Sequence, residues 1–204
     1  MQNASTLNLF NAARLNQAKQ IDSLLGAGAD LASVDANGQT PLMHAAKHGS
    51  TLSVIYLLEA GAEPLTIDAN GQTALHLACE HGQERAAIHL YYNGGFTENP
   101  DSSGMTILDH VAATQHGDIA KNPTALLGAL SHNWSDDGLV NTLTKWQKWS
   151  DDASQADHAG GAARPVPNPQ AIAELLLAKE IREQAKRLGF NSRQPCVPKA
   201  RFHS

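Results

Sequence analysis

The apolar residues in the first two-thirds of the chain form short groups separated by turn residues. One group predicts a helix between Thr40 and Gly49, because threonine suits a helix N-cap, Pro41 suits the first helical position, and glycine favours the left-handed conformation that often ends a helix. A second helix is predicted after it, apolar at Val54 and Leu57, and it ends at the next glycine. The pattern therefore predicts a pair of short antiparallel helices.

The same pattern recurs 33 residues further along the chain. Residues 35–40 read Asp-Ala-Asn-Gly-Gln-Thr, the same six types stand at 68–73, and a weaker copy opens at 101–106. Agreement between the first two copies continues through Leu42 and Leu75, Ala45 and Ala78, Gly49 and Gly82, Leu57 and Leu90, and Gly61 and Gly94. Residues 2–34 are a degenerate copy, as expected for a terminal repeat with one face in water.

In these residues the chain resembles the ankyrin repeat family, over about residues 2–134. The resemblance implies an all-α ankyrin-repeat solenoid of about four repeats, each a helix-turn-helix pair with a β-turn or hairpin loop. The repeats are expected at 2–34 (a cap), 35–67, 68–100 and 101–134 (irregular). The sequence departs from the family pattern at the histidine after Thr-Pro-Leu, which is present as His76 but replaced by Met43 and Asp109.

The composition agrees with closely stacked helices. Aromatic residues make up 5% of the 204 residues, which is low, whereas alanine occurs 32 times. We expect the alanines where helices of neighbouring repeats approach one another. Cys79 stands where the neighbouring repeats have alanine, so it is expected to be a small buried hydrophobe rather than a nucleophile.

The three tryptophans lie at the end of the repeats and just beyond it, between 134 and 149. Residues 135–150 are predicted to form a capping helix, with Leu143, Trp146 and Trp149 at helical spacing. The tryptophan rings close the open hydrophobic end of the stack in one interpretation. In the other, Trp146 or Trp149 is an interface anchor for a partner or a second copy of the chain.

The C-terminal part of the chain differs from the repeats in charge. Residues 151–168 have the composition of a linker, and residues 169–204 are predicted to be a basic helix with a tail. Residues 1–134 hold 5 basic and 12 acidic side chains (−7), whereas residues 159–204 hold 8 basic and 3 acidic ones (+5). The helix is therefore expected to dock on the same chain or on a neighbouring copy, which allows a homo-oligomer through the C-terminal helices.

Several classes of protein are disfavoured by the composition. No apolar run approaches the roughly 18 residues of a membrane helix, the first residues do not read as a signal peptide, and we expect a cytoplasmic protein. The net charge of −5 argues against nucleic-acid binding. Neither a cofactor nor a metal is expected: His48, His81 and His116 recur about 10 Å apart, too far to share one ion, and suit helix C-termini instead.

The family resemblance implies that a partner protein binds at the loop tips and on the exposed inner helices, which together form a concave surface. The expected tip residues are Ala36, Asn37, Gln39, Ala69, Asn70, Gln72, Ser102, Ser103 and Met105. The expected inner-helix residues are His44, Lys47, His48, Leu77, Glu80 and His81. The alternative for the repeated Ala-Asn-Gly-Gln tips is that they are merely good turn formers.

The sequence shows no motif for catalysis. It contains no glycine-rich phosphate loop, no nucleophile elbow and no pair of carboxylates at a suggestive spacing. We therefore expect a non-enzymatic protein that binds a partner protein through its concave face and, in the sharper form of this hypothesis, inhibits it by occlusion. The alternative is a regulatory or effector protein whose C-terminal helical region is the active element, with the repeats for targeting.

Overall fold

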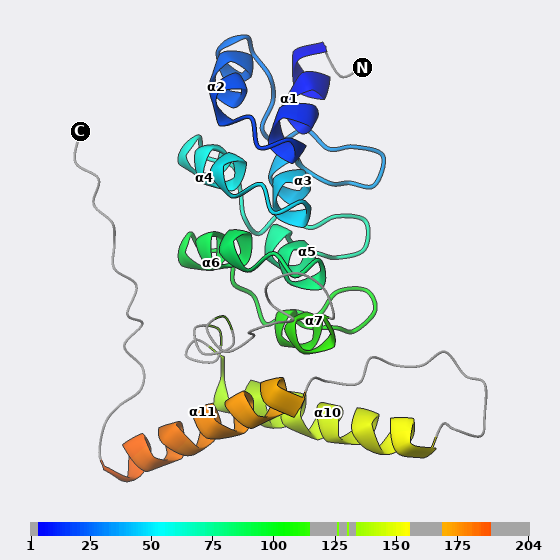
Figure 1. Ribbon diagram of the computed structural model, residues 1–204, viewed down its shortest axis with the longest axis vertical. Helices are drawn as coiled ribbons and strands as arrows, with labels where there is room; N and C mark the ends of the chain where they lie inside the picture. Colours follow the sequence, from blue (N-terminus) through cyan, green and yellow to red (C-terminus); the bar gives the residue numbers. More distant parts are fainter. Residues whose placement is uncertain (1–3, 115–125, 127–129, 131–133, 156–168, 189–204) are drawn as a thin grey trace.

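The computed structural model describes residues 4–114, 126, 130, 134–155 and 169–188. The helices are α1 (Ala4–Arg14), α2 (Ala18–Gly26), α3 (Pro41–Lys47), α4 (Thr51–Glu59), α5 (Ala74–Glu80), α6 (Glu84–Tyr92), α7 (Ile107–Ala113), α10 (Asp136–Gln155) and α11 (Pro169–Arg187). Figure 1 shows the inner helices α1, α3, α5 and α7 in one column and the outer helices α2, α4 and α6 in another. The described residues contain no strand, so the prediction of an all-α stack of helix pairs is confirmed.

Each of the inner helices α3, α5 and α7 begins at a threonine whose side chain caps it. The threonine hydroxyl accepts a hydrogen bond from the backbone N–H three residues later, and the side chain of that later residue accepts one from the threonine N–H. The three pairs are Thr40 with Met43, Thr73 with His76, and Thr106 with Asp109. The helices α3 and α5 end before Gly49 and Gly82, which have φ of 67° and 69°.

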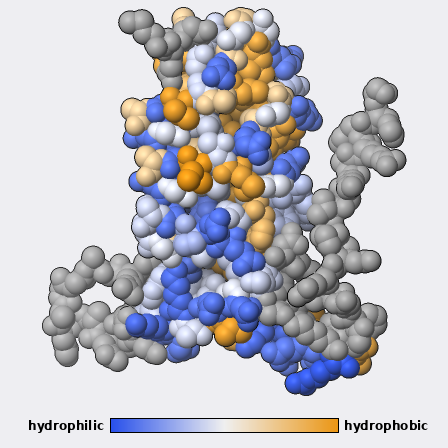
Figure 2. Space-filling view, turned by 180° about the vertical axis from the view of Figure 1, so that it is seen from behind, coloured by the Kyte–Doolittle hydropathy of each residue, from blue (hydrophilic) through white to orange (hydrophobic). Residues whose placement is uncertain are grey.

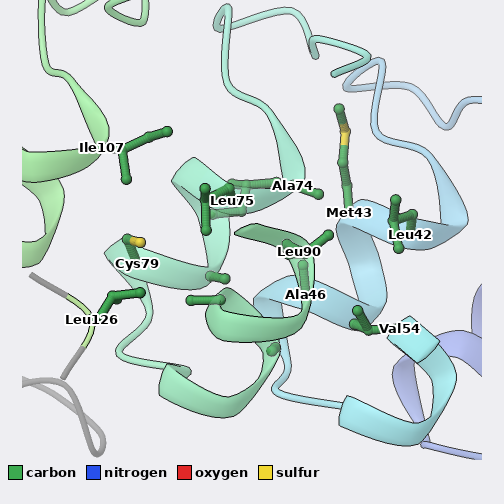
Figure 3. Packing of buried hydrophobic residues seen from close by; sticks show 14 of the residues in the cluster. Leu42, Met43, Ala46, Val54, Ala74, Leu75, Cys79, Leu90, Ile107 and Leu126 are labelled. Atoms are coloured by element: carbon green, nitrogen blue, oxygen red, sulfur yellow. The ribbon is translucent and has the colours of Figure 1, made fainter. Parts of the chain in front are cut away.

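Small residues fill the core where the inner helices meet. Ala12, Ala45 and Ala78 occupy equivalent positions in successive repeats and are buried, which allows close approach of the helices. Figure 3 shows the larger core residues following one another along the stack from α3 through α5 to α7. Cys79 is fully buried among them, as predicted, and burial raises the pKa of its thiol.

The C-terminal helices lie across one end of the stack (Figure 1). The helix α10 extends to Gln155, so residues 151–155 are helical where a linker is predicted. The helix α11 begins at Pro169, as predicted from the sequence. The predicted features at 115–125, including His116, at 156–168 and at 189–204 lie outside the described residues.

Candidate functional site

The three loop tips share one backbone conformation that an aspartate holds in place. In the first tip, Asp35 Oδ1 accepts hydrogen bonds from the N–H groups of Asn37 and Gln39, over 2.8 and 2.9 Å. Asp68 and Asp101 hold the other two tips through the same pair of bonds, over 2.8–3.0 Å. The shared pattern of bonds therefore gives the three tips the same hydrogen-bonded turn.

Backbone hydrogen bonds join each tip to the next one. The Ala69 N–H donates to the Asn37 carbonyl over 3.0 Å, and the Ser102 N–H donates to the Asn70 carbonyl over 2.9 Å. A side chain at Gly38 would place its Cβ 3.1 Å from the Ala69 nitrogen, so the small residue allows this approach. The tips therefore form one continuous ridge along the hairpin side of the stack (Figure 1).

The structure separates the fifteen expected concave-surface residues into three groups. Eight are exposed: Ala36, Asn37, His48, Ala69, Asn70, Glu80, Ser102 and Ser103. Four are half-buried: His44, Lys47, His81 and Met105. Three are buried: Gln39, Gln72 and Leu77. For these last three, the expectation of an exposed side chain is wrong.

The buried residues of this set hold the ridge together. Gln39 Nε2 donates to Asp68 Oδ2 over 3.1 Å and so connects the first tip to the second. Gln72 Nε2 donates to Glu80 Oε2 over 2.9 Å, which fixes an exposed carboxylate of the inner helix. Leu77 is buried, and it occupies the position at which the flanking repeats have a histidine paired to the tip aspartate.

Histidines support the ridge from the inner helices. His44 Nε2 lies 2.9 Å from Asp35 Oδ2, and His110 Nε2 lies 2.9 Å from Asp101 Oδ2. Burial by itself raises the pKa of Asp101, but the hydrogen bonds from Met105 and His110 outweigh burial and leave this pKa below its ordinary value. The pKa of Asp35 is lowered in the same way. The carboxylates of these tips therefore remain ionised at neutral pH.

Two further histidines end the inner helices. His48 Nδ1 lies 3.0 Å from the His44 carbonyl, and His81 Nδ1 lies 3.0 Å from the Leu77 carbonyl. Each ring nitrogen therefore donates to a carbonyl of the last helical turn, where helices leave acceptors unpaired. Among the described residues, no group of three or more His, Cys, Asp or Glu side chains could hold a metal ion.

His76 and His110 are both buried in the described part of the stack, and His76 is neutral at neutral pH. The backbone N–H of Thr73 donates to Nδ1 of His76 over 3.3 Å, so the ring proton lies on Nε2, which has no hydrogen-bond partner among the described residues. Burial and the neighbouring His110 lower the pKa of His76 to about 4. The ring lines a cavity of about 120 Å³ together with Leu65 and Ile67.

A comparison with known families identifies this architecture. The family model for ankyrin repeats, in three copies, matches residues 9–101. Residues 9–101 of the chain are ankyrin repeats. The matched segment spans α1 to the start of the third tip, and the search of curated proteins finds no match to the chain.

Three exposed hydrophobic residues beside the ankyrin tips were not among the expected site residues. Val34 and Ile67 stand directly before the tip aspartates of two successive repeats, and Leu65 lies in the same loop as Ile67. Figure 2 shows that hydrophobic surface is concentrated on the repeat stack in that view. The spacing of 33 residues between Val34 and Ile67 is the signal that would have found these two, because surface positions recur with the repeat as core positions do.

The departure from the ankyrin pattern at Asp109 joins the stack to α10. Asp109 is fully buried; its Oδ1 accepts from Trp146 Nε1 over 2.6 Å, and its Oδ2 accepts from Lys145 Nζ over 2.6 Å. Glu98 accepts hydrogen bonds from the N–H and hydroxyl of Ser135, at the start of the same helix. A carboxylate at position 109 therefore makes contacts that the family's histidine would not make.

The two expected interface tryptophans are buried within the chain. Trp146 has no exposed surface, and Trp149 is buried with the Lys145 ammonium 4.9 Å from its ring centroid. Neither ring is exposed for a partner, because both pack on the end of the repeat stack. None of the described helices is both long enough and apolar enough to span a membrane.

Proposed function

We propose that this protein is a non-enzymatic, cytoplasmic binding protein that holds a partner protein against its ridge of ankyrin tips. Ankyrin repeats are generally protein–protein interaction modules and are typically not enzymes. The observation that carries the proposal is the ridge: three tips in one conformation, joined by backbone hydrogen bonds, whose small side chains face outward. Because the hydrogen bonds already order the ridge, binding of a partner costs little additional free energy for ordering the ridge.

The composition of the surface indicates the kind of partner. Val34, Leu65 and Ile67 supply exposed apolar area beside the ridge, and Asn37 and Asn70 supply amide groups at its crest. Interfaces combine apolar anchors with a polar rim in this way. We propose a partner that presents an apolar patch flanked by hydrogen-bonding groups. Such a partner would be inhibited if the covered patch is its own active site or binding surface.

A paired set of variants tests this function. Asn37→Arg together with Asn70→Arg adds two bulky charges to the ridge, and neither change removes a hydrogen bond of the Asp35 or Asp68 turns, which use backbone N–H groups. The matched control is Gln20→Arg with Ala60→Arg, at exposed positions on the outer-helix side. The full-length wild type and both variants would be used as baits in affinity capture from cells, followed by mass spectrometry.

We expect a protein captured by the wild type and the control to be lost from the ridge variant. With that protein in hand, titration should show at least about a tenfold weaker affinity for the ridge variant, equal to about 1.4 kcal/mol. Equal capture by all three baits would exclude the ridge as the binding surface.

A second candidate places the function in the C-terminal helices, with the repeats for targeting. The observation in its favour is the exposed aliphatic surface of α11, at Leu177 and Ile181. Trp146→Ala cannot test it, because loss of this buried ring would disturb the docking of α10 itself. Capture that is lost in Leu177→Asp but kept in the ridge variant would favour this candidate.

A further inference from the structure

The helix α11 exposes a row of large aliphatic side chains. Leu177 and Ile181 on α11, and Leu188 directly after its last residue, have exposed fractions of 52%, 56% and 74%. Spacings of four and seven residues place these three residues on one side of the helix. The exposed Ala173, four residues before Leu177, lies on the same side. We call these four residues the outer stripe of α11.

The other side of α11 faces the rest of the chain, and Leu176, which lines the cleft with α10 there, is 51% exposed. Ile172 packs against the hydrophobic core, and Lys179 is half-buried in the cleft that α10 and α11 form. These two residues are seven apart and lie opposite Ile181 on a helix of 3.6 residues per turn. In Figure 1, α10 and α11 diverge below the stack, so the C-terminal part of α11 extends away from α10. The outer stripe is therefore left exposed by the part of the chain that the structure describes.

An exposed apolar row of this kind is typical of a surface that packs against another molecule or segment. A single exposed leucine, such as Leu52 on α4 at 52%, is ordinary in a protein surface. Three large aliphatic residues aligned on one helix are instead typical of a helix that packs against another helix. We therefore expect a second helix to pack against the outer stripe.

The charges beside the outer stripe indicate a second copy of α11. Glu180 and Arg187 are both exposed and, being seven residues apart, lie on the same flank of the stripe. When two α11 helices lie antiparallel with Leu177 of one near Leu188 of the other, their matching flanks face each other. Glu180 of each helix then falls near Arg187 of the other, so that two opposite-charge pairs form by symmetry.

We propose that the outer stripe of α11 is the interface of an antiparallel homodimer of this protein. The contact is isologous: the same row of residues covers itself about a two-fold axis, as in most homodimers. The ridge of ankyrin tips takes no part in it, so the proposal is independent of the binding function proposed above. A dimer would present two ridges and would raise the avidity for a partner with two binding patches.

The mass of the full-length protein in solution tests the dimer. Sedimentation equilibrium of the wild type should give a mass that rises from 21.7 kDa toward twice that value as the concentration rises from about 1 to about 200 μM, the range of a weak dimer. Leu177→Asp should raise the dissociation constant at least about 100-fold, since each dimer would place two carboxylates in an apolar contact. Leu52→Asp is the matched control, because both leucines are 52% exposed, and it should leave the mass unchanged.

A charge exchange tests the antiparallel arrangement. Glu180→Arg alone, or Arg187→Glu alone, should weaken the dimer several-fold at low salt, because like charges then face each other. The double variant E180R/R187E should restore the wild-type dissociation constant. A wild type that stays at 21.7 kDa throughout the series, or a double variant as weak as the single ones, would overturn the proposal. A monomer that sediments with anionic vesicles through Leu177 would likewise overturn it, in favour of a lipid surface.

Discussion

Trp146 donates a hydrogen bond from its indole Nε1 to Asp109 Oδ1 over 2.6 Å, across 37 residues of sequence. The same carboxylate closes the capping box of α7, where its Oδ2 accepts from the Thr106 N–H over 2.8 Å. Asp109 therefore accepts hydrogen bonds both from the start of α7 and from the docked helix α10. Asp109 is therefore one buried link between the end of the repeat stack and α10, with Lys145 supplying the opposite charge.

Asp109→Asn should destabilise the protein by about 2–4 kcal/mol, because the amide group cannot accept all of these hydrogen bonds and leaves Lys145 without its partner charge. The measurement is urea unfolding of the full-length protein, followed by circular dichroism. Asp22→Asn changes an exposed carboxylate on α2 in the same way and should stay within about 0.5 kcal/mol of the wild type. Equal effects of the two substitutions would contradict the role assigned to Asp109.

Trp146→Phe should cost about 1.5–3 kcal/mol, because it keeps most of the aromatic volume but removes the donor to a charged acceptor. In a double-mutant cycle with Asp109→Ala, the two losses should fall short of additivity by at least about 0.5 kcal/mol. The unfolding free energies of the four proteins give this coupling directly. Additive losses would mean that the two side chains stabilise the fold independently.

The local features of the stack could be predicted from the sequence because each depends on a few neighbouring residues. Thr40 and Thr73 cap helices, Gly49 and Gly82 end them, and the 33-residue spacing sets the register of the repeats. These signals are carried by propensity and spacing alone. The ankyrin fold follows from them without knowledge of any long-range contact.

The contacts between repeats could not be predicted in the same way. Gln39 was expected to face a partner, but it is buried because its amide reaches Asp68, 29 residues away. Asp109 was noted only as a departure from the family's histidine, and its partner Trp146 lies in a different helix. Such pairs depend on how the elements stack, and one sequence does not show which polar residues will meet. A carboxylate at a position that the repeat buries is the signal from which a hydrogen-bonding side chain elsewhere in the chain could have been predicted.

Gly49→Ala should destabilise the protein by about 1–3 kcal/mol. Gly49 has φ of 67°, which an alanine adopts only with strain, and its Cβ would meet the flexible Gln83 side chain. Gly26→Ala is the matched control, since Gly26 lies in α2 and a Cβ there would meet nothing within 4 Å. Thermal unfolding should show a lower Tm for the first variant and an unchanged or higher Tm for the second. Equal Tm values for the two variants would argue against a left-handed helix end at Gly49.

The buried His76 should make the stability depend on pH. Its pKa is about 4 in the folded protein against 6.5 in the unfolded chain, so the unfolded chain binds the proton more tightly. The stabilising effect of a neutral His76 is complete above pH 6.5 and is lost as the pH falls from 6.5 toward 4. A difference of this size corresponds to about 3 kcal/mol over that window.

His76→Leu separates this contribution from those of the other titrating groups. The variant should be less stable than the wild type at pH 7, because the N–H of Thr73 loses its acceptor. As the pH is lowered to 4, only the wild type has His76 to protonate, so the gap between the two unfolding free energies should narrow by about 3 kcal/mol and can reverse. Urea unfolding at a series of pH values measures the gap. If the two stability curves stay parallel from pH 7 to 4, the imidazole titrates as freely in the folded protein as in the unfolded chain, and the neutral, buried state of His76 is refuted.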